Sequence, residues 1–204
     1  MAELVLIRHG ETAWSRTGQH TGITDIPLTA RGEQQARQLS HALHGRPFAA
    51  VCCSPRQRAR DTARLAGLRT TGIDEALAEW DYGAYDGQTT SDISAQLGRP
   101  WSLWTDGVAP GATPGETLQQ VAARAAAVLA RARPILDAGD DVALVAHGHI
   151  LRVLTATWLR LAPEAGALFA LSPGSISTLS FEHDRPALLS WNHIPAPTTT
   201  MSAR

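Results

Sequence analysis

Short apolar runs recur along the chain at intervals that leave room for a helix between them. Three of these runs have the length and composition of buried strands, namely residues 4–7, 49–53 and 141–146. Two later segments, 175–182 and 187–191, are largely apolar or alternate between apolar and polar side chains, which also predicts strands. The pattern therefore indicates a sheet built from at least five strands.

Helical spacing of apolar residues predicts the elements between the strands. A stripe repeating every three or four positions indicates a helix over residues 29–44, with Thr29 as its N-cap. Ser54 and Pro55 are residue types that favour an N-cap and a first helical position, so we expect a helix to begin there. We expect Pro134 to bend or end the longest helix. Further helices are expected over residues 90–97, 117–138, 150–158 and 163–169.

Strands that alternate with helices are typical of an α/β protein. We expect a three-layer αβα sandwich, with a mostly parallel central sheet and helices on both faces. The connections at 11–27 and 80–115 are long, and long loops are often functional. With 204 residues, the chain is expected to form one domain over residues 1–194, followed by a mobile Pro- and Thr-rich tail at 195–204.

The composition is that of an ordinary globular protein, with 44% hydrophobic and 18% charged residues. A net charge of −1 gives no electrostatic reason to expect a nucleic-acid or membrane partner. No stretch approaches the roughly 20 apolar residues that a membrane span needs, and the start lacks the features of a signal peptide. The adjacent Cys52 and Cys53 cannot form a disulfide framework, so we expect a cytoplasmic protein.

Three of the expected strands end in residues that can carry chemistry. Arg8 and His9 follow the first strand, and His147 follows the third. After the second strand, Arg58 lies one helical turn beyond the expected helix start. The carboxyl ends of parallel strands meet at one edge of a sheet, where α/β proteins bind ligands. Arginine forks suit phosphoryl oxygens, and a neutral histidine beside them can act as a nucleophile.

The motifs around these residues resemble those of the histidine phosphatase superfamily, the phosphoglycerate-mutase-like proteins. The sequence Arg-His-Gly-Glu-Thr at 8–12 is similar to the signature of that family. Four further stretches match in family order, and together with the signature they span nearly the whole chain: 14–29, 54–59, 79–87 and 147–148.

The resemblance implies roles for individual residues. His9 would accept the phosphoryl group as a phosphohistidine, while Arg8, Arg58 and His147 would bind the phosphoryl oxygens. Glu79 would protonate the leaving oxygen and then activate water. No metal or other cofactor is expected, because the arginines would stabilise the phosphoryl charge. The positions that would contact or approach the substrate are Ser15, Thr21, Gly22, Tyr82 and Gly148.

Two features bear on the type of phosphoryl transfer. The family commonly has Asn where this chain has Ser15, whose hydroxyl can still donate to phosphate. The mutases resemble Glu-Arg-His-Tyr-Gly at the acid segment, whereas here Trp80 and Asp81 follow Glu79. A substrate carboxylate would find few partners, so we expect hydrolysis of small phosphorylated metabolites rather than mutase activity.

The motif pattern most resembles that of the actinobacterial acid phosphatases and the fungal sedoheptulose-bisphosphatases, which favours a sugar phosphate as substrate. Trp101 and Trp104 suit either a substrate contact or the core. The cofactor-dependent phosphoglycerate mutases remain the alternative reaction. The oligomeric state is open, with a homodimer as one option.

Alternative interpretations remain for several residues. Cys52 and Arg58 fit the Cys-x5-Arg spacing of cysteine-dependent phosphatases, although Pro55 would remove one amide from such a loop. His9, His147 and His149 could be taken for a metal site, but no carboxylate or thiolate is placed to complete it. A non-catalytic regulator that binds phosphorylated ligands is the alternative of another class. Five histidines have no motif context and are expected on the surface or in loops: His20, His41, His44, His183 and His193.

Overall fold

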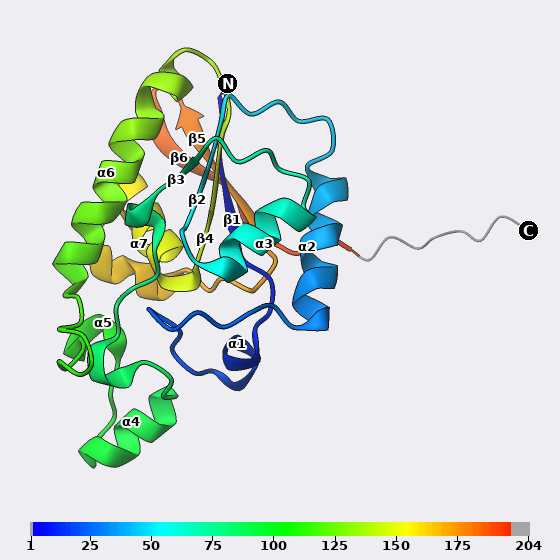
Figure 1. Ribbon diagram of the computed structural model, residues 1–204. Coiled ribbons are helices and arrows are strands. Elements are labelled where there is room, and N and C mark those ends of the chain that lie inside the picture. The colour runs from blue at the N-terminus through cyan, green and yellow to red at the C-terminus, as the bar shows by residue number, and fades with distance from the viewer. Residues whose placement is uncertain (1, 197–204) are drawn as a thin grey trace, which may run out of the picture.

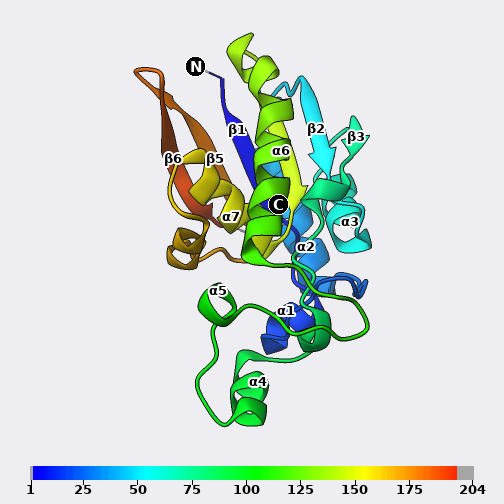
Figure 2. The ribbon, with the colours of Figure 1, turned by 90° about the vertical axis from the view of Figure 1, so that its left-hand side faces the viewer.

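The computed structural model describes residues 2–196 and contains one six-stranded sheet between two layers of helices. In Figure 1 the sheet is seen nearly edge-on, with α6 and α7 on one side and α2 and α3 on the other. Figure 2 shows α6 crossing in front of the sheet, which confirms the expected three-layer αβα sandwich. The strands are β1 (Leu4–Arg8), β2 (Ala50–Cys53), β3 (Gly72–Ile73), β4 (Val142–Ala146), β5 (Ile176–Glu182) and β6 (Arg185–His193).

The sheet has the order β3-β2-β4-β1-β5-β6, with its first four strands parallel. The last two strands form an antiparallel hairpin whose first member pairs with β1. Because β2, β4 and β1 are neighbours and point the same way, their carboxyl ends lie side by side. This arrangement brings the three chemistry-bearing strand ends together, as the sequence predicts.

The side chains of β1 show why the sheet is covered on both faces. Leu4 and Leu6 pack into the core beneath α6 and α7, whereas Val5 and Ile7 pack beneath α2 and α3. Successive residues of a strand point to opposite faces, so an uninterrupted apolar run is needed to fill both layers.

The α-helices are α1 (Ala13–Thr17), α2 (Ala30–Ala42), α3 (Gln57–Leu65), α4 (Thr90–Leu97), α5 (Leu103–Asp106), α6 (Leu118–Asp137) and α7 (Gly148–Trp158).

Three short 3₁₀ helices complete the described chain, and they lie in the connections. Both long connections contain helices, because α1 interrupts the loop over 11–27 and α5 lies within 80–115. In Figures 1 and 2 this second connection, with α4 and α5, lies beyond the carboxyl end of β1. The 3₁₀ helices are η1 (Glu75–Leu77), η2 (Gly83–Tyr85) and η3 (Pro163–Leu168).

Two expected helix boundaries are wrong. The helix expected to begin at Ser54 and Pro55 starts only at Gln57, because the Ser54 hydroxyl is bonded to the ring of His147 and does not cap the helix. Instead, the carboxylate of Asp25 accepts the backbone N–H of Gln57 from a distant loop. The helix expected from Ile150 begins at Gly148, so His147 is its N-cap residue.

Pro134 does not end α6, which continues through it to Asp137. Buried Ala132 and Leu136 hold the helix against the core on either side of the proline, so packing offsets the missing hydrogen bond. Most of the tail expected to be mobile lies outside the described residues, although Pro195 is described and buried. Within residues 2–196, none of the helices has both the length and the hydropathy needed to cross a membrane.

Candidate active site

A cavity of about 150 Å³ lies where β1 and β4 end. It brings together residues from β1, the loop around α1, the segment before η2 and the start of α7. Seven residues singled out from the sequence line it: Arg8, His9, Ser15, Thr21, Glu79, Tyr82 and Gly148. Arg58, His147 and Gly22 do not line the cavity but lie behind its wall.

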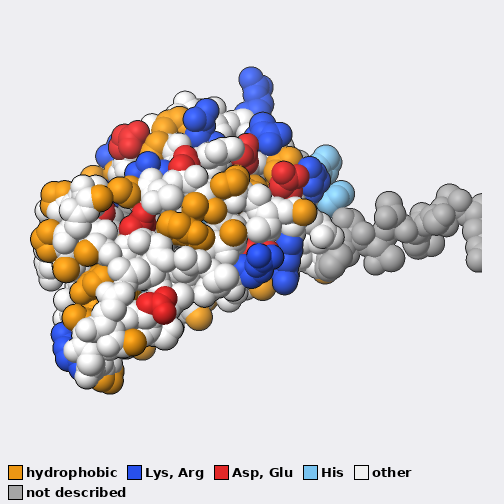
Figure 3. All heavy atoms as spheres, turned by 60° about the horizontal axis from the view of Figure 1, so that its bottom comes forward, with side chains coloured by type: hydrophobic (Ala, Val, Ile, Leu, Met, Phe, Trp, Pro, Cys, Tyr) orange, Lys and Arg blue, Asp and Glu red, His pale blue; other side chains and the backbone are white. Residues whose placement is uncertain are grey.

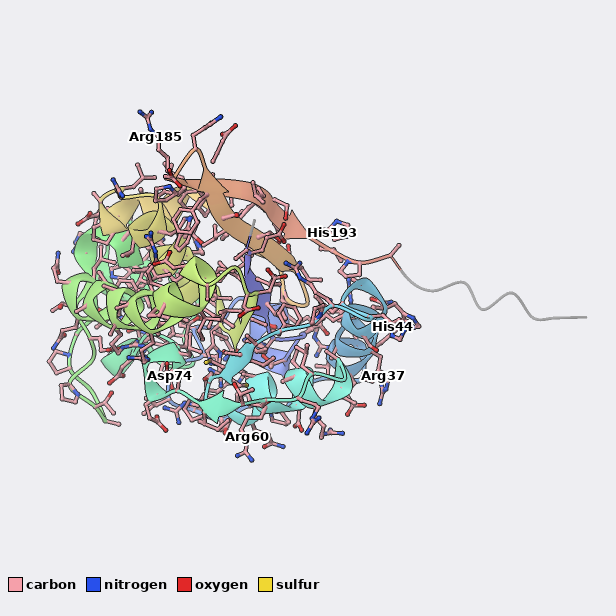
Figure 4. All side chains as sticks on the ribbon, turned by 90° about the horizontal axis from the view of Figure 1, so that it is seen from above. Arg37, His44, Arg60, Asp74, Arg185 and His193 are labelled. Carbon is pink, nitrogen blue, oxygen red and sulfur yellow. The ribbon has the colours of Figure 1, made fainter. Side chains whose placement is uncertain are left out.

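A larger, open groove of about 870 Å³ lies elsewhere, along α3 and β3. It contains Arg60, which points away from the sheet in Figure 4. No histidine or glutamate of the candidate set lines this groove. The candidate chemistry therefore belongs to the smaller cavity, and Arg60 and Arg64 form an exposed helix face.

His9 is buried and held in one orientation. Its Nδ1–H donates to the backbone carbonyl of Gly10 at 2.7 Å, which leaves Nε2 as the unprotonated nitrogen. Burial, together with the positive charges of Arg58 and Arg8, holds the pKa of His9 well below the usual 6.5. The imidazole is therefore neutral at physiological pH, with a lone pair available for reaction at Nε2.

Arg58 and His147 form a buried layer behind His9. The Arg58 Nε–H donates to Nδ1 of His147 at 3.1 Å, and Nε2 of His147 lies 2.7 Å from the Ser54 hydroxyl. With Nδ1 accepting, the His147 ring must carry its proton on Nε2 and donate it to Ser54. Burial and the Arg58 charge lower the pKa of His147 well below 6.5, so this ring is neutral as well.

The remaining N–H groups of Arg58 hold the loop that contains Thr21 and Gly22. They donate to the carbonyl oxygens of Thr21, Gly22 and Thr24 at 2.9–3.1 Å. From the other side, the Asp86 carboxylate accepts the backbone N–H groups of Gly22 and Thr24. Direct contact between Arg58 and a phosphoryl group, as the resemblance implies, would require this loop to release the guanidinium.

Arg8 is the guanidinium that faces the cavity directly beside His9. It donates to the carbonyl of Leu171. Gly148 lies against it, and a Cβ on Gly148 would come within 3.3 Å of the Arg8 Cζ. A side chain at this position would displace the Arg8 guanidinium by a few tenths of an ångström, so glycine lets the start of α7 and Arg8 pack closely as one wall.

Glu79 lines the same cavity and lies against the amino end of α7. Its Oε1 accepts the backbone N–H groups of Trp80 and Ile150, and its Oε2 accepts that of His149. Burial alone would raise the pKa of this carboxyl, but the hydrogen bonds and nearby histidines outweigh burial and hold the pKa well below 4.5. Glu79 is therefore ionised when the cavity is empty.

A second network fixes the backbone that carries Glu79. The Arg124 guanidinium donates to the carbonyls of Ala76 and Ala78 at 2.7 and 3.0 Å. It is paired with both carboxylate oxygens of Glu116, and Oε2 of Glu116 also accepts the N–H of Asp81. The segment between α6 and the cavity is thus held on both sides, which limits where the carboxylate can point.

The cavity also contains residues that the sequence analysis did not assign to it. His20, expected on the surface or in a loop, lies 4.9 Å from the Tyr82 ring and 5.5 Å from the Trp101 ring. Burial lowers its pKa to about 4. Arg152 also lines the cavity and stacks over the Trp104 ring at 4.6 Å. His20 lies within the matched stretch 14–29, which could have indicated it, and Arg152 could have been indicated by its spacing one turn after Gly148.

The other residues that were predicted to contact the substrate are held by neighbouring protein groups. The Ser15 hydroxyl donates to the carbonyl of Thr12, within a capping box of α1, and still lines the cavity. The Tyr82 hydroxyl lies 2.6 Å from Nδ1 of His149. The Trp101 ring is 5% exposed and packs in the core, as one of its two predicted options requires.

The arrangement does not support the alternative chemistries. Burial raises the pKa of the Cys52 thiol, and neither cysteine lines the cavity. His149 lies in the first turn of α7, beyond the strand that His147 follows. Within the part of the chain that the structure describes, no three His, Cys, Asp or Glu side chains are grouped to hold a metal ion.

Comparisons with known proteins agree with the geometry. Residues 4–194 match the profile of the histidine phosphatase superfamily (branch 1). An acid phosphatase of Mycobacterium tuberculosis is 42% identical over 185 residues, covering 88% of this chain and 87% of that protein. A sedoheptulose 1,7-bisphosphatase of Saccharomyces cerevisiae is 34% identical over 77% of this chain and 67% of its own length.

A solved structure extends the agreement to the backbone. The structure of an open reading frame of Mycobacterium tuberculosis superposes with a TM-score of 0.88 at 38% identity. The superposition covers 96% of this chain and 99% of the other.

Proposed function

This chain belongs to the histidine phosphatase superfamily, and from that premise we propose that it hydrolyses small phosphomonoesters through a phosphohistidine on His9. The phosphatases among its relatives support the phosphatase class. The observation that carries the proposal is the state of His9. Its Nδ1–H is held by the Gly10 carbonyl, and its neutral Nε2 belongs to a ring that lines a cavity beside Arg8.

In the first step, Nε2 of His9 attacks phosphorus and the bond to the ester oxygen breaks. Arg8, with Gly148 at the start of α7 beside it, stabilises the charge on the phosphoryl oxygens. Arg58 and His147 support His9 from behind, and they contact the phosphoryl group directly once the loop at Thr21 moves. The leaving oxygen departs as an alcohol after receiving a proton through Glu79.

In the second step, water attacks the phosphohistidine and Glu79 takes the proton that the water loses. Inorganic phosphate leaves, and His9 returns to its neutral state. Because Glu79 is ionised in the empty cavity, the proton for the first step has to enter with or after the substrate. A phosphomonoester monoanion can bring that proton, since the second pKa of a phosphate is about 6. This favours acid-phosphatase behaviour.

We propose a sugar phosphate as the substrate class. Tyr82, His20 and His149 also line the cavity, and the Trp104 ring lies 5.4 Å from that of His149. Aromatic faces combined with neutral donors and acceptors suit a polyol, whose hydroxyl groups need partners without strong charge. The bisphosphatase relative acts on a sugar bisphosphate, which supports the same class. We further propose a cytoplasmic location, because Cys52 and Cys53 are free thiols.

A cofactor-dependent phosphoglycerate mutase is the second candidate, and one observation favours it. The sequence offers few partners for a substrate carboxylate, but the structure places Arg152 on the cavity. Mutase activity is therefore to be assayed beside hydrolysis, with 3-phosphoglycerate and 2,3-bisphosphoglycerate. A mutase rate above the hydrolysis rate would favour the second candidate.

The test of the proposed function is a labelling experiment. A 32P-labelled sugar phosphate is mixed with the enzyme and quenched, and the protein-bound label is tested for stability in acid and in base. We expect a label that is lost in acid, survives in base and is absent from His9→Ala. If neither label nor hydrolysis is found across a panel of phosphomonoesters, the chain is not a phosphatase. The alternative of a regulator that binds phosphorylated ligands without catalysis would then apply.

A further inference from the structure

The side chain of His149 lies between the carboxylate of Glu79 and the hydroxyl of Tyr82. Its backbone N–H holds Oε2 at 2.9 Å, a contact that any residue at this position could make. Its side-chain Nδ1 lies 3.8 Å from the same oxygen and 2.6 Å from the Tyr82 hydroxyl. When the imidazole is neutral, its Nδ1 accepts a hydrogen bond from the Tyr82 hydroxyl. When the imidazole is protonated, its charge is attracted to the carboxylate of Glu79.

The two oxygens of Glu79 differ in what they can still accept. Oε1 is held by the N–H groups of Trp80 and Ile150, whereas Oε2 accepts only the N–H of His149 among the described contacts. A carboxylate oxygen has two lone pairs, so Oε2 retains capacity on the side that His149 faces. A proton that travels through Glu79 is thus best placed on or near Oε2.

His149 is surrounded by charged and titratable groups that belong to several different elements of the fold. Arg8 approaches from β1, Arg152 from the next turn of α7, and Glu79 and Tyr82 from the segment before η2. His20 lies 5.9 Å away, from the loop after α1. In the empty cavity, burial lowers the pKa of His149, and Arg152 and Arg8 add to this effect while Glu79 opposes it.

Substrate binding changes this balance. A phosphoryl dianion beside Arg8 and His9 brings negative charge into the cavity that His149 also lines. The added charge offsets that of the arginines, and opposite charge favours the protonated imidazole. Nδ1–H then faces Oε2 of Glu79, and the Tyr82 oxygen becomes an acceptor.

We propose that His149 is a positioning residue that holds, in a pair with Glu79, the proton destined for the leaving oxygen. The pair gains one proton when the substrate binds. As the P–O bond breaks and the phosphoryl group joins His9, that proton passes through Glu79 to the alcohol. The pair regains a proton from the water that hydrolyses the phosphohistidine and gives it up with the departing phosphate, so that Glu79 and His149 return to their starting state. This inference rests on the proposed function and adds a residue to it.

The test compares His149→Asn with the wild type on two substrates. Asparagine keeps the backbone N–H and an acceptor near the position of Nδ1, but it cannot take up a proton. With glycerol 2-phosphate, whose alkoxide needs protonation, we expect kcat at pH 7 to fall about 10-fold or more. With p-nitrophenyl phosphate, whose leaving group needs no proton, we expect a change below about threefold.

The pH profile supplies a readout that a merely structural role would not move. In His149→Asn, the decline of kcat for glycerol 2-phosphate toward high pH should begin about one pH unit lower than in the wild type. The matched control is His20→Gln, which changes a neighbouring imidazole that has no contact with Glu79. Because His20 is proposed to contact the alcohol part of the substrate, its effect is expected on KM, and the position of the basic limb of kcat should stay unchanged.

Two outcomes would overturn the inference while leaving the proposed function intact. One is equal slowing of both substrates by His149→Asn, and the other is an unmoved basic limb. Thermal unfolding and binding of inorganic vanadate establish that the variant is folded, and His149→Gln serves as the second variant if it is not. Failure of the wild type to hydrolyse either substrate would instead remove the proposed function and this inference with it.

Discussion

Arg58 and His147 are hydrogen-bonded to each other at 3.1 Å while neither side chain is exposed to solvent. The ring of His147 lies edge-on to that of His9, with centroids 5.1 Å apart. One buried guanidinium thus lies beside two imidazoles and lowers the pKa of both, after the larger effect of burial. The positive charge that keeps His9 neutral comes from behind the cavity as well as from Arg8 within it.

This relationship predicts that Arg58 is needed for stability as well as activity. Arg58→Met keeps the length of the side chain but leaves the carbonyls of Thr21, Gly22 and Thr24 without their donor. Each unsatisfied buried group costs about 1–3 kcal/mol, so we expect a loss of about 3 kcal/mol or more in the free energy of unfolding. Urea unfolding measures this loss.

The control for this variant is Arg60→Met on the same helix. Arg60 is exposed, so the expected change in stability is within about 0.5 kcal/mol. Arg58→Met should also lower kcat/KM strongly, because the loop that contains Thr21 loses its anchor. A variant with wild-type stability would show that the guanidinium does not hold this loop in solution.

Glu79→Gln tests the acid–base role of the carboxylate. The amide keeps an oxygen that can accept N–H groups, but it cannot carry a proton to the leaving oxygen. We expect a loss of about 10²- to 10⁴-fold in kcat for alkyl phosphates and a much smaller loss for p-nitrophenyl phosphate. Steady-state rates over a series of leaving groups measure this difference. Equal slowing across the series would count against Glu79 as the general acid.

Gly32 in α2 is expected to resist substitution, although alanine usually stabilises a helix. A Cβ at this position would lie 2.1 Å from the carbonyl oxygen of Glu11, two residues after His9. Gly32→Ala must therefore push the loop that follows His9, and overpacking of this kind costs about 1–3 kcal/mol. We expect lower thermal stability together with reduced kcat.

Gly72→Ala provides the matched control for this prediction. Gly72 lies on β3, where an added Cβ would meet nothing within 4 Å. Its stability is expected to stay within about 0.5 kcal/mol of the wild type, and its activity should be unchanged. Full activity and stability in Gly32→Ala would show that the two backbones can separate without cost.

The strands, and the reactive residues at their carboxyl ends, could be predicted from the sequence because they depend on local patterns. An apolar run such as residues 4–7 must be buried on both faces, and the residues directly after it must emerge at one edge. The family resemblance then identified Glu79, which no periodicity places near His9. In the structure, His9 and Glu79 line the same cavity, although 70 positions separate them in the sequence.

What could not be predicted depends on contacts between distant segments. Ser54 has the right residue type for an N-cap, but His147 engages its hydroxyl across 93 positions of sequence and Asp25 caps α3 instead. His20 stands in a polar loop and has no assigned role in the matched stretch 14–29, and the packing of that loop onto Tyr82 makes it part of the cavity. Local signals cannot report such partners, because each residue alone is compatible with solvent.

Alkylation distinguishes the proposed mechanism from a cysteine-dependent one. Cys52 and Cys53 lie on β2, and neither contributes to the cavity. Burial raises the pKa of the Cys53 thiol to about 12, so little thiolate is available at neutral pH. We expect enzyme treated with iodoacetamide, and the variant Cys52→Ser, to retain activity. Loss of activity after alkylation of Cys52, with the fold intact, would support the cysteine-dependent alternative.

Acid is expected to destabilise the fold through its buried histidines, and His20 allows the effect to be measured. Burial, with a smaller contribution from the charge of His149, lowers its pKa from 6.5 to about 4. Between these two values the unfolded chain binds a proton at this position that the folded chain does not. Stability therefore rises with pH in this window, and the contribution of His20 is complete above about pH 6.5.

One pKa unit corresponds to 1.36 kcal/mol, so lowering the pH from 6.5 to 5 should remove about 2 kcal/mol through His20 alone. His9, His147 and His149, whose pKa values are also lowered, act in the same direction. His20→Gln should therefore flatten the dependence of the free energy of unfolding on pH, as measured by urea unfolding at pH 7, 6 and 5. His44→Gln, on the exposed surface after α2 in Figure 4, should keep the wild-type slope.

The surface does not offer a competing explanation for such a slope. On the face shown in Figure 3, arginine and acidic side chains are interspersed among apolar ones, and the chain has a net charge of only −1. General repulsion between like charges is therefore small near neutral pH. A slope for His20→Gln identical to that of the wild type would mean that His20 binds its proton over the same pH range in the folded and unfolded chain, so the ring in the cavity would be charged at pH 5.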